Sequence, residues 1–193
     1  MSNYEIFDAL HNNDMTELKR LVLEENATVN CFTNEHGKIR YGNTPLNHAI
    51  SIEDQELIDL LFELGEDVNL AACDGWNVLL HAVEFSTLHF IKLLISKGAN
   101  ILATYREEGY NVGVLGRCVN RDLESPDFRN YLLPLVQEKI KELRDVYLSV
   151  NANKETIYHL LRKKIEIDIS NEELKEIIGI EKDVVIEDEE ESE

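Results

Sequence analysis

The chain has 193 residues, of which 44% are hydrophobic, and a formal net charge of −19. This length and apolar content suffice for one folded domain or an elongated repeat array, and they exclude a wholly disordered chain. The acidic surplus opposes binding to nucleic acid or anionic membrane through phosphate groups. It favours a basic partner, or it serves solubility alone.

The N-terminal segment, MSNYEIFDAL, carries acids where a secretory signal peptide carries basic residues. No later run approaches the roughly 18 uninterrupted apolar residues that indicate a membrane span. The cysteines Cys31, Cys73 and Cys118 show neither Cys-x-x-Cys nor Cys/His spacing for zinc. We therefore expect a cytoplasmic protein with free thiols, no membrane segment and no metal.

A 33-residue period organises the first two thirds of the sequence. Gly42 aligns with Gly75, TPLNHA with NVLLHA, and LIDLLFELGEDVN with FIKLLISKGANIL. An earlier unit ends in the same way at an offset of 39, where LKRLVLEENATVN matches LIDLLFELGEDVN, and a fourth unit begins near Gly109. The period predicts repeats over about residues 3–30, 39–69, 72–102 and 106–133.

Each unit is expected to contain two short helices. LIDLLFEL places leucine at i, i+3, i+4 and i+7, the spacing of one buried helix face. Gly65 and Gly98 follow such runs at the position of a left-handed C-cap, and Asn26 takes that position in the first unit.

These motifs resemble the ankyrin repeat. GNTPLNHA is similar to the Gly-x-Thr-Pro-Leu-His-x-Ala opening of that family, and LLFELGEDVN and LLISKGAN are similar to its close. The resemblance covers about residues 3–133 and implies an all-α, ankyrin-type helical solenoid with hairpin turns. The family histidine falls on Asn47 and Leu80, and the Thr-Pro pair occurs only in the second unit. We therefore expect irregular turns at Asn77 and Asn111.

After residue 124 the pattern changes to longer helices. Ser125 and Pro126 suit a helix start, and Pro134 is expected to break or kink the helix that follows. Residues 134–180 are expected to form a helical cap over the last repeat, the alternative being an independent partner-binding helix. Residues 181–193 are strongly acidic and are expected to be disordered. They are interpreted as a solubilising tail, a docking element or an export signal similar to Glu-rich effector C-termini.

The resemblance to ankyrin repeats also implies which residues face a partner, because equivalent positions in that family line the concave side. In this sequence they are Arg40, Tyr41, Asn43, Ser51, Ile52, Cys73, Asp74, Trp76, Glu84, Phe85, Glu107, Glu108 and Tyr110. The aromatic members are expected to form one exposed stripe beside acids, typical of binding hot spots. The alternative is that Trp76 and Tyr110 fold back on their own turns or on the inserted segment 31–41.

The sequence contains no recognisable catalytic, phosphate-binding or cofactor motif. His48 and His81 lie at equivalent repeat positions, so the period explains them without a metal. We expect a monomeric, non-enzymatic module without cofactors that binds a basic protein, possible roles being an inhibitor or immunity protein. The alternative is a secreted effector or adaptor that docks on host proteins. Less favoured are a nucleic-acid mimic and a small enzyme within residues 125–180.

Overall fold

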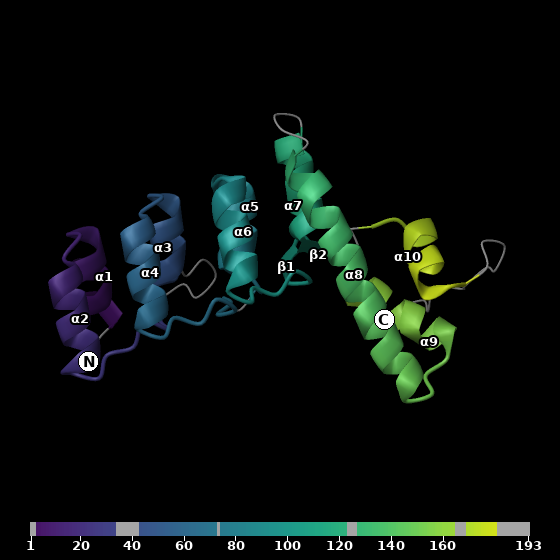
Figure 1. Cartoon of the computed structure of the whole chain (residues 1–193), viewed down its shortest axis with the longest axis horizontal. Helices are drawn as coiled ribbons and strands as arrows, with labels where there is room; N and C mark the ends of the chain where they lie inside the picture. The colour runs from purple at the N-terminus through teal and green to yellow at the C-terminus, as the bar shows by residue number, and fades with distance from the viewer. Residues whose placement is uncertain (1–2, 34–42, 73, 123–126, 165–168, 181–193) are drawn as a thin grey trace. The chain divides into compact units, whose positions relative to one another are not determined.

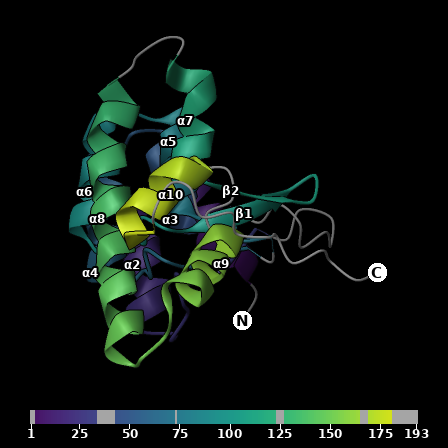
Figure 2. The same cartoon turned by 90° about the vertical axis from the view of Figure 1, so that its right-hand side faces the viewer.

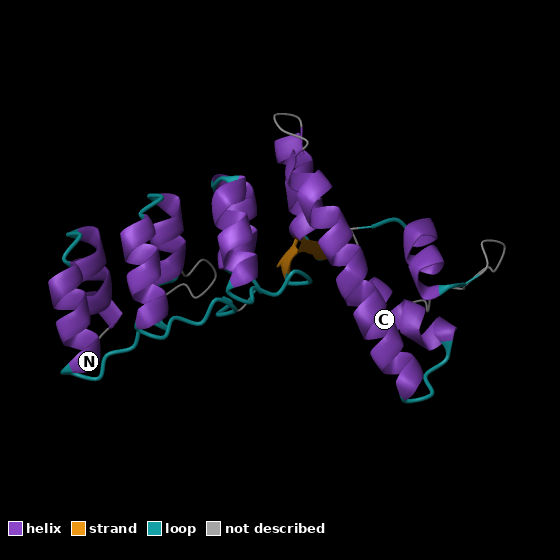
Figure 3. Cartoon of the chain, in the orientation of Figure 1, coloured by secondary structure: helices purple, strands orange, loops and turns teal. Residues whose placement is uncertain are grey.

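The computed structural model describes residues 3–33, 43–72, 74–122, 127–164 and 169–180. Across these residues the chain forms ten helices and one two-stranded sheet (Figures 1 and 3). The chain divides into two compact units, residues 1–105 and residues 106–193. None of the described helices has the length and apolar character needed to cross a bilayer.

The first unit consists of three helix pairs that stand side by side (Figure 1). Their bounds are α1 Asn3–His11 with α2 Met15–Leu23, α3 Pro45–Ser51 with α4 Gln55–Glu63, and α5 Val78–Phe85 with α6 Leu88–Ser96. The helices α1, α3 and α5 pack against one another and are called the inner helices below; α2, α4 and α6 are the outer helices. Each pair is one unit of the 33-residue period.

Side-chain caps explain where these helices begin. The hydroxyl of Thr44 accepts a hydrogen bond from Asn47 N at 3.1 Å at the start of α3. Asn77 does the same for α5, where its Oδ1 accepts from Leu80 N at 3.1 Å. The prediction of an irregular turn at Asn77 is therefore wrong, because asparagine is as good an N-cap as threonine. At Asn111 the turn is replaced by a strand.

The loops that join the repeats are tied together by asparagine side chains. Asn30 Nδ2 donates to Gly65 O at 2.9 Å, and Asn30 Oδ1 accepts from Asp67 N at 2.6 Å. Asn69 makes the same two bonds to the next loop, at 3.1 and 2.8 Å. The last residue of the motif Val-Asn therefore links each repeat to the one that follows.

The first repeat is one residue longer than the sequence alignment suggested. The N-caps Asp14 and Asp54 are 40 residues apart, whereas the left-handed residues Asn26 (φ 57°) and Gly65 (φ 87°) are 39 apart. The helix-ending role expected for Asn26 and Gly65 is confirmed. The offset of 39 holds only after the helix, so Leu18 is equivalent to Ile58 rather than to Leu57.

A hairpin begins at Thr104, in the last residues of the first unit, and leads into the four helices of the second unit. The strands β1 Thr104–Glu107 and β2 Tyr110–Gly113 pair around Glu108 (φ 49°) and Gly109 (φ 96°). Two residues of positive φ are the geometry of a type I′ turn. The helices are α7 Val114–Asp122, α8 Asp127–Ser149, α9 Lys154–Lys164 and α10 Asn171–Ile178.

The long helix α8 holds the second unit together. It packs on α7, α9 and α10, and Figure 2 shows α9 and α10 beside it. The expected break at Pro134 is wrong, because α8 continues through that residue. The expected division at 133/134 consequently lies inside a helix. The role of α9 and α10 as a cap over the repeats stays a prediction.

The short helix α10 has defined ends. Ser170 and Glu173 form a capping box, and Gly179 adopts the left-handed C-cap (φ 79°). Arg144 Nη1 donates to Ile177 O and Lys154 Nζ donates to Gly179 O, both at 2.6 Å. Cations at the carbonyl end of a helix offset its dipole, so these bonds fix α10 on α8 and α9.

Candidate functional site

Two apolar side chains project from the ends of neighbouring inner helices. Ile52 is the C-cap of α3 and is 51% exposed; Phe85 is the last residue of α5 and is 58% exposed. They are equivalent residues of the second and third repeats, one period apart. We call these two residues, with the adjacent acids Glu53 and Glu84, the inner-face patch.

Trp76 is less outward-facing than the sequence predicted, and its contact with a partner stays a prediction. It is half-buried, and its ring makes edge contacts with Tyr105 at 4.9 Å and His81 at 6.3 Å between centroids. Its backbone is also held, since Trp76 N donates to Asp74 Oδ1 at 3.0 Å and Trp76 O accepts from Ala72 N at 2.8 Å. Trp76 therefore folds back on its own unit, and Asp74 serves its own turn.

His81 links two inner helices beneath Phe85. It is 7% exposed, its Nε2 lies 2.7 Å from Ser51 Oγ, and its ring is tilted on Phe85 at 5.0 Å. Burial lowers the pKa of His81 to about 4, so the imidazole is neutral at pH 7. Ser51 Oγ donates its one proton to Asn47 O at 2.8 Å. His81 is accordingly the donor to Ser51.

This proton arrangement is unlike a nucleophile and its base. A catalytic histidine accepts the serine proton, whereas here the proton points to a helix carbonyl. His11 and His48 also meet, edge to face at 5.2 Å. Within the described ranges, however, no three His, Cys, Asp or Glu side chains converge on a metal position.

The remaining predicted residues fall in three places. Asn43 is exposed in the first unit and pairs with Thr33, through Thr33 N to Asn43 O at 3.0 Å and Asn43 N to Thr33 Oγ1 at 3.2 Å. The second unit carries Glu107, Glu108 and Tyr110 on its hairpin, all exposed, and Glu107 forms an ion pair with a nearby arginine at 3.3 Å. Arg40, Tyr41 and Cys73 lie outside the described residues, so a single stripe through all these positions stays a prediction.

Basic residues are distributed unevenly in the first unit. Among its described residues, each Lys and Arg lies on an outer helix or at its end: Lys19, Arg20, Lys92 and Lys97. The inner helices carry acids instead, namely Glu5, Asp8 and Glu84. Within the described residues, the inner helices are therefore negative, whereas the outer helices carry both signs of charge.

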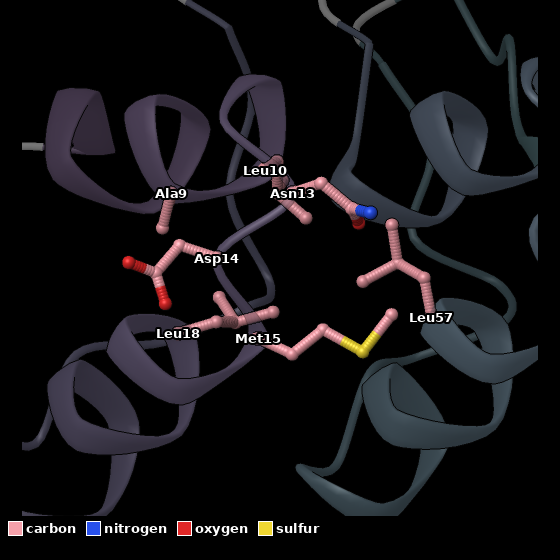
Figure 4. Close-up of a pocket in the computed structure, with 7 residues that line it drawn as sticks. All are labelled: Ala9, Leu10, Asn13, Asp14, Met15, Leu18 and Leu57. Carbon is pink, nitrogen blue, oxygen red and sulfur yellow. The ribbon is translucent and has the colours of Figure 1, made fainter.

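A small cleft lies between the first two repeats (Figure 4). It is lined by Ala9, Leu10, Asn13, Asp14, Met15, Leu18 and Leu57. The cleft is too narrow for a water molecule, and Asp14 already caps α2. This cleft therefore does not suit a small-molecule ligand.

Sequence reasoning missed one buried acid. Glu66 is 7% exposed at the position where the next repeat has Ala99, and among the described residues no donor meets its carboxylate in full hydrogen-bond geometry. Burial raises the pKa of Glu66 to about 8, although nearby Leu46 N and Thr44 partly offset that effect. Burial, with the Glu66 charge, also raises the pKa of Cys31 to about 12. The alignment of Glu66 with a small apolar residue was the signal available in the sequence.

Comparison with known proteins agrees with the repeat architecture. The family model for ankyrin repeats, in three copies, matches residues 6–105. The chain belongs to the ankyrin-repeat family. Ankyrin repeats stack into extended binding surfaces, so the chain is a protein–protein interaction module.

Three curated proteins are similar to part of this chain. XBAT34 of Arabidopsis thaliana, named as an E3 ubiquitin-protein ligase candidate, is 32% identical over 119 residues, covering 55% of this chain and 30% of its own length. The B-cell lymphoma 3 protein homolog of Mus musculus is 31% identical over 129 residues, covering 66% and 26%. The ankyrin repeat protein FPV244 of fowlpox virus is 29% identical over 85 residues, covering 44% and 12%. The chain spans less than a third of the length of these relatives.

Proposed function

We propose that this ankyrin-repeat chain is a non-enzymatic module that binds a basic protein through the inner-face patch of its first unit. The observation that carries the proposal is the exposure of Ile52 and Phe85 at equivalent places on packed inner helices. Exposed apolar side chains in adjacent repeats offer a partner an area to bury, which is the main source of binding energy.

Charge supports a basic partner. The patch holds Glu53 and Glu84 beside its apolar residues, and the described cations of the first unit lie on the outer helices. The whole chain has a net charge of −19. A negative surface accelerates the association of a positive partner and weakens as salt screens it.

Two roles are compatible with such binding. In the first, the chain is an inhibitor or immunity protein that occludes the working surface of a basic protein. In the second, it is an adaptor or a secreted effector that docks on host proteins, which the acidic C-terminal sequence favours. The proton arrangement at Ser51 and the narrow cleft of the first unit support a role in binding over one in catalysis.

The proposal is tested by affinity capture with matched charge reversals. Glu53→Lys changes the inner-face patch, and Glu63→Lys makes the same change of net charge on the outer helix α4. We expect a basic protein to be retained by the wild type and by Glu63→Lys, and lost with Glu53→Lys. Retention should also fall between about 0.05 M and about 0.3 M salt. Equal retention by both variants, or capture of acidic proteins alone, would contradict the proposal.

A further inference from the structure

A series of rings runs from Tyr105, just beyond the third repeat, into that repeat and ends at the exposed ring of Phe85. Tyr105 meets Trp76 at 4.9 Å, Trp76 meets His81 at 6.3 Å, and His81 meets Phe85 at 5.0 Å. Tyr105 and His81 are buried and Trp76 is half-buried, whereas Phe85 at the end of the series is 58% exposed. Phe85 is therefore positioned by the rings behind it, although most of its own surface faces solvent.

No cation within the described residues occupies this exposed ring. The contrast is Phe62 on the outer helix α4, where Lys97 Nζ lies 4.9 Å from the ring centroid. The ring that does cover one side of Phe85 belongs to His81, whose buried imidazole is neutral at pH 7. The electron-rich face of Phe85 is thus available to a positive group from another molecule.

The surroundings of Phe85 fit a long cationic side chain. Ile52 gives an apolar surface on the neighbouring inner helix, suited to the methylene stem of an arginine. Glu53 and Glu84 place negative charge at the same ends of the two helices. Arginine matches such a site better than lysine, because its planar guanidinium stacks on an aromatic face and is weakly hydrated.

We propose that Phe85 is the binding position for an arginine side chain of the partner, with the stem of that arginine lying over Ile52. This inference rests on the proposed function, since it specifies what the basic partner presents to the inner-face patch. It assigns the preference for arginine to one aromatic ring, not to the overall negative charge of the chain.

The test uses the full chain and a labelled nona-arginine peptide as the probe, with nona-lysine for comparison. Binding is followed by fluorescence polarisation near physiological salt for the wild type, Phe85→Ala, Phe85→Leu and Leu23→Ala. Phe85→Leu keeps an apolar side chain but removes the π-face. Leu23→Ala is the matched control, because Leu23 is 70% exposed on the outer helix α2. Circular dichroism melting verifies that each variant is folded.

We expect nona-arginine to bind the wild type more tightly than nona-lysine. Phe85→Ala and Phe85→Leu should weaken nona-arginine binding by about threefold or more, and should bring it close to nona-lysine binding. Leu23→Ala should leave both unchanged. If nona-arginine binds but neither Phe85 variant weakens that binding, Phe85 is not the binding position for arginine. The proposal of a basic partner would remain supported in that case. If neither peptide binds even at low salt, the basic partner of the proposed function fails as well.

Discussion

The Ser51 hydroxyl of the second ankyrin repeat lies 2.7 Å from Nε2 of His81 in the third. The same diagonal relationship joins the first and second repeats, where His11 meets His48. In each case a residue near the end of one inner helix contacts the middle of the next. The inner helices are consequently tied together directly beneath the surface proposed to bind a partner.

Ser51→Ala should destabilise the chain through this link. Removing the hydroxyl leaves the buried Nε2–H of His81 without its acceptor, which typically costs about 1–2 kcal/mol. Ser96→Ala is the control, since Ser96 is likewise an exposed serine that bonds its own helix, at 2.7 Å to Leu93 O, but it lies at the end of the outer helix α6. Urea unfolding should show a clearly lower free energy of unfolding for Ser51→Ala and little change in it for Ser96→Ala. Equal effects would mean that the inter-repeat bond is unimportant for stability.

Glu66 should make the chain less stable as pH rises. Its pKa is about 8 when folded and about 4.5 when unfolded, so the folded state holds the proton more tightly and stability is lost between those values. His81 acts in the opposite sense, because its lowered pKa removes stability as pH falls from about 6.5 to about 4. The interval from about pH 6.5 to about pH 8 therefore isolates Glu66.

Urea unfolding across that interval measures the effect. The wild type should lose about 1–2 kcal/mol of unfolding free energy between pH 6.5 and pH 8, as the buried Glu66 carboxyl ionises. Glu66→Ala, which introduces the residue of the next repeat, should abolish this loss and raise stability at pH 8. Glu63→Gln, on the exposed surface of α4, should behave as the wild type. A pH dependence that survives in Glu66→Ala would contradict this assignment.

Gly75→Ala should be far more damaging than the same change at Gly98. Both residues have φ 91°, so both substitutions incur the strain of a left-handed residue, about 1 kcal/mol. At Gly75 an added Cβ would also lie 2.3 Å from Thr104 O, whereas at Gly98 it would meet nothing within 4 Å. Thermal unfolding should show a loss above about 3 kcal/mol for Gly75→Ala alone. Similar losses of unfolding free energy for the two variants would indicate that the backbone at Thr104 moves to accommodate the added Cβ.

Trp76 and Phe85 should separate stability from binding. Trp76→Ala removes a half-buried ring that contacts Tyr105 and His81, and should cost about 2 kcal/mol of unfolding free energy. Phe85→Ala should cost under about 1 kcal/mol, because most of the ring is exposed, yet it should weaken partner capture. Melting curves beside capture assays compare the two. If Trp76→Ala is as stable as the wild type, the result would instead favour the prediction from sequence that Trp76 contacts a partner.

Sequence periodicity predicted the repeat architecture because local signals repeat with it. Gly65 ends its helix in the left-handed region as expected, and Asn26 does so in its place in the first repeat. The capping box at Ser170 and Glu173 can also be predicted from the sequence, since all its hydrogen bonds lie within four residues. Features set by neighbouring residues in sequence could therefore be inferred without the structure.

Features that depend on contacts between residues distant in sequence could not be inferred without the structure. The burial of Trp76 depends on Tyr105, which lies beyond the next helix pair in sequence. The continuity of α8 through Pro134 likewise reflects packing, because Leu132 and Val136 are buried on either side of it. Packing of such a stripe offsets the one backbone bond that proline removes. Distant contacts also changed the candidate site. The sequence predicted an aromatic stripe, whereas the structure leaves the patch around Ile52 and Phe85 as the candidate.

Hydrogen–deuterium exchange tests most directly the central claim that the inner face of the first unit binds the partner. The chain is measured alone and bound to the protein that capture identifies, with Phe85→Ala as a comparison. We expect protection at the ends of α3 and α5, around Ile52 and Phe85, and reduced protection in the variant. Protection confined to the outer helices α2, α4 and α6, or to the second unit, would contradict the account.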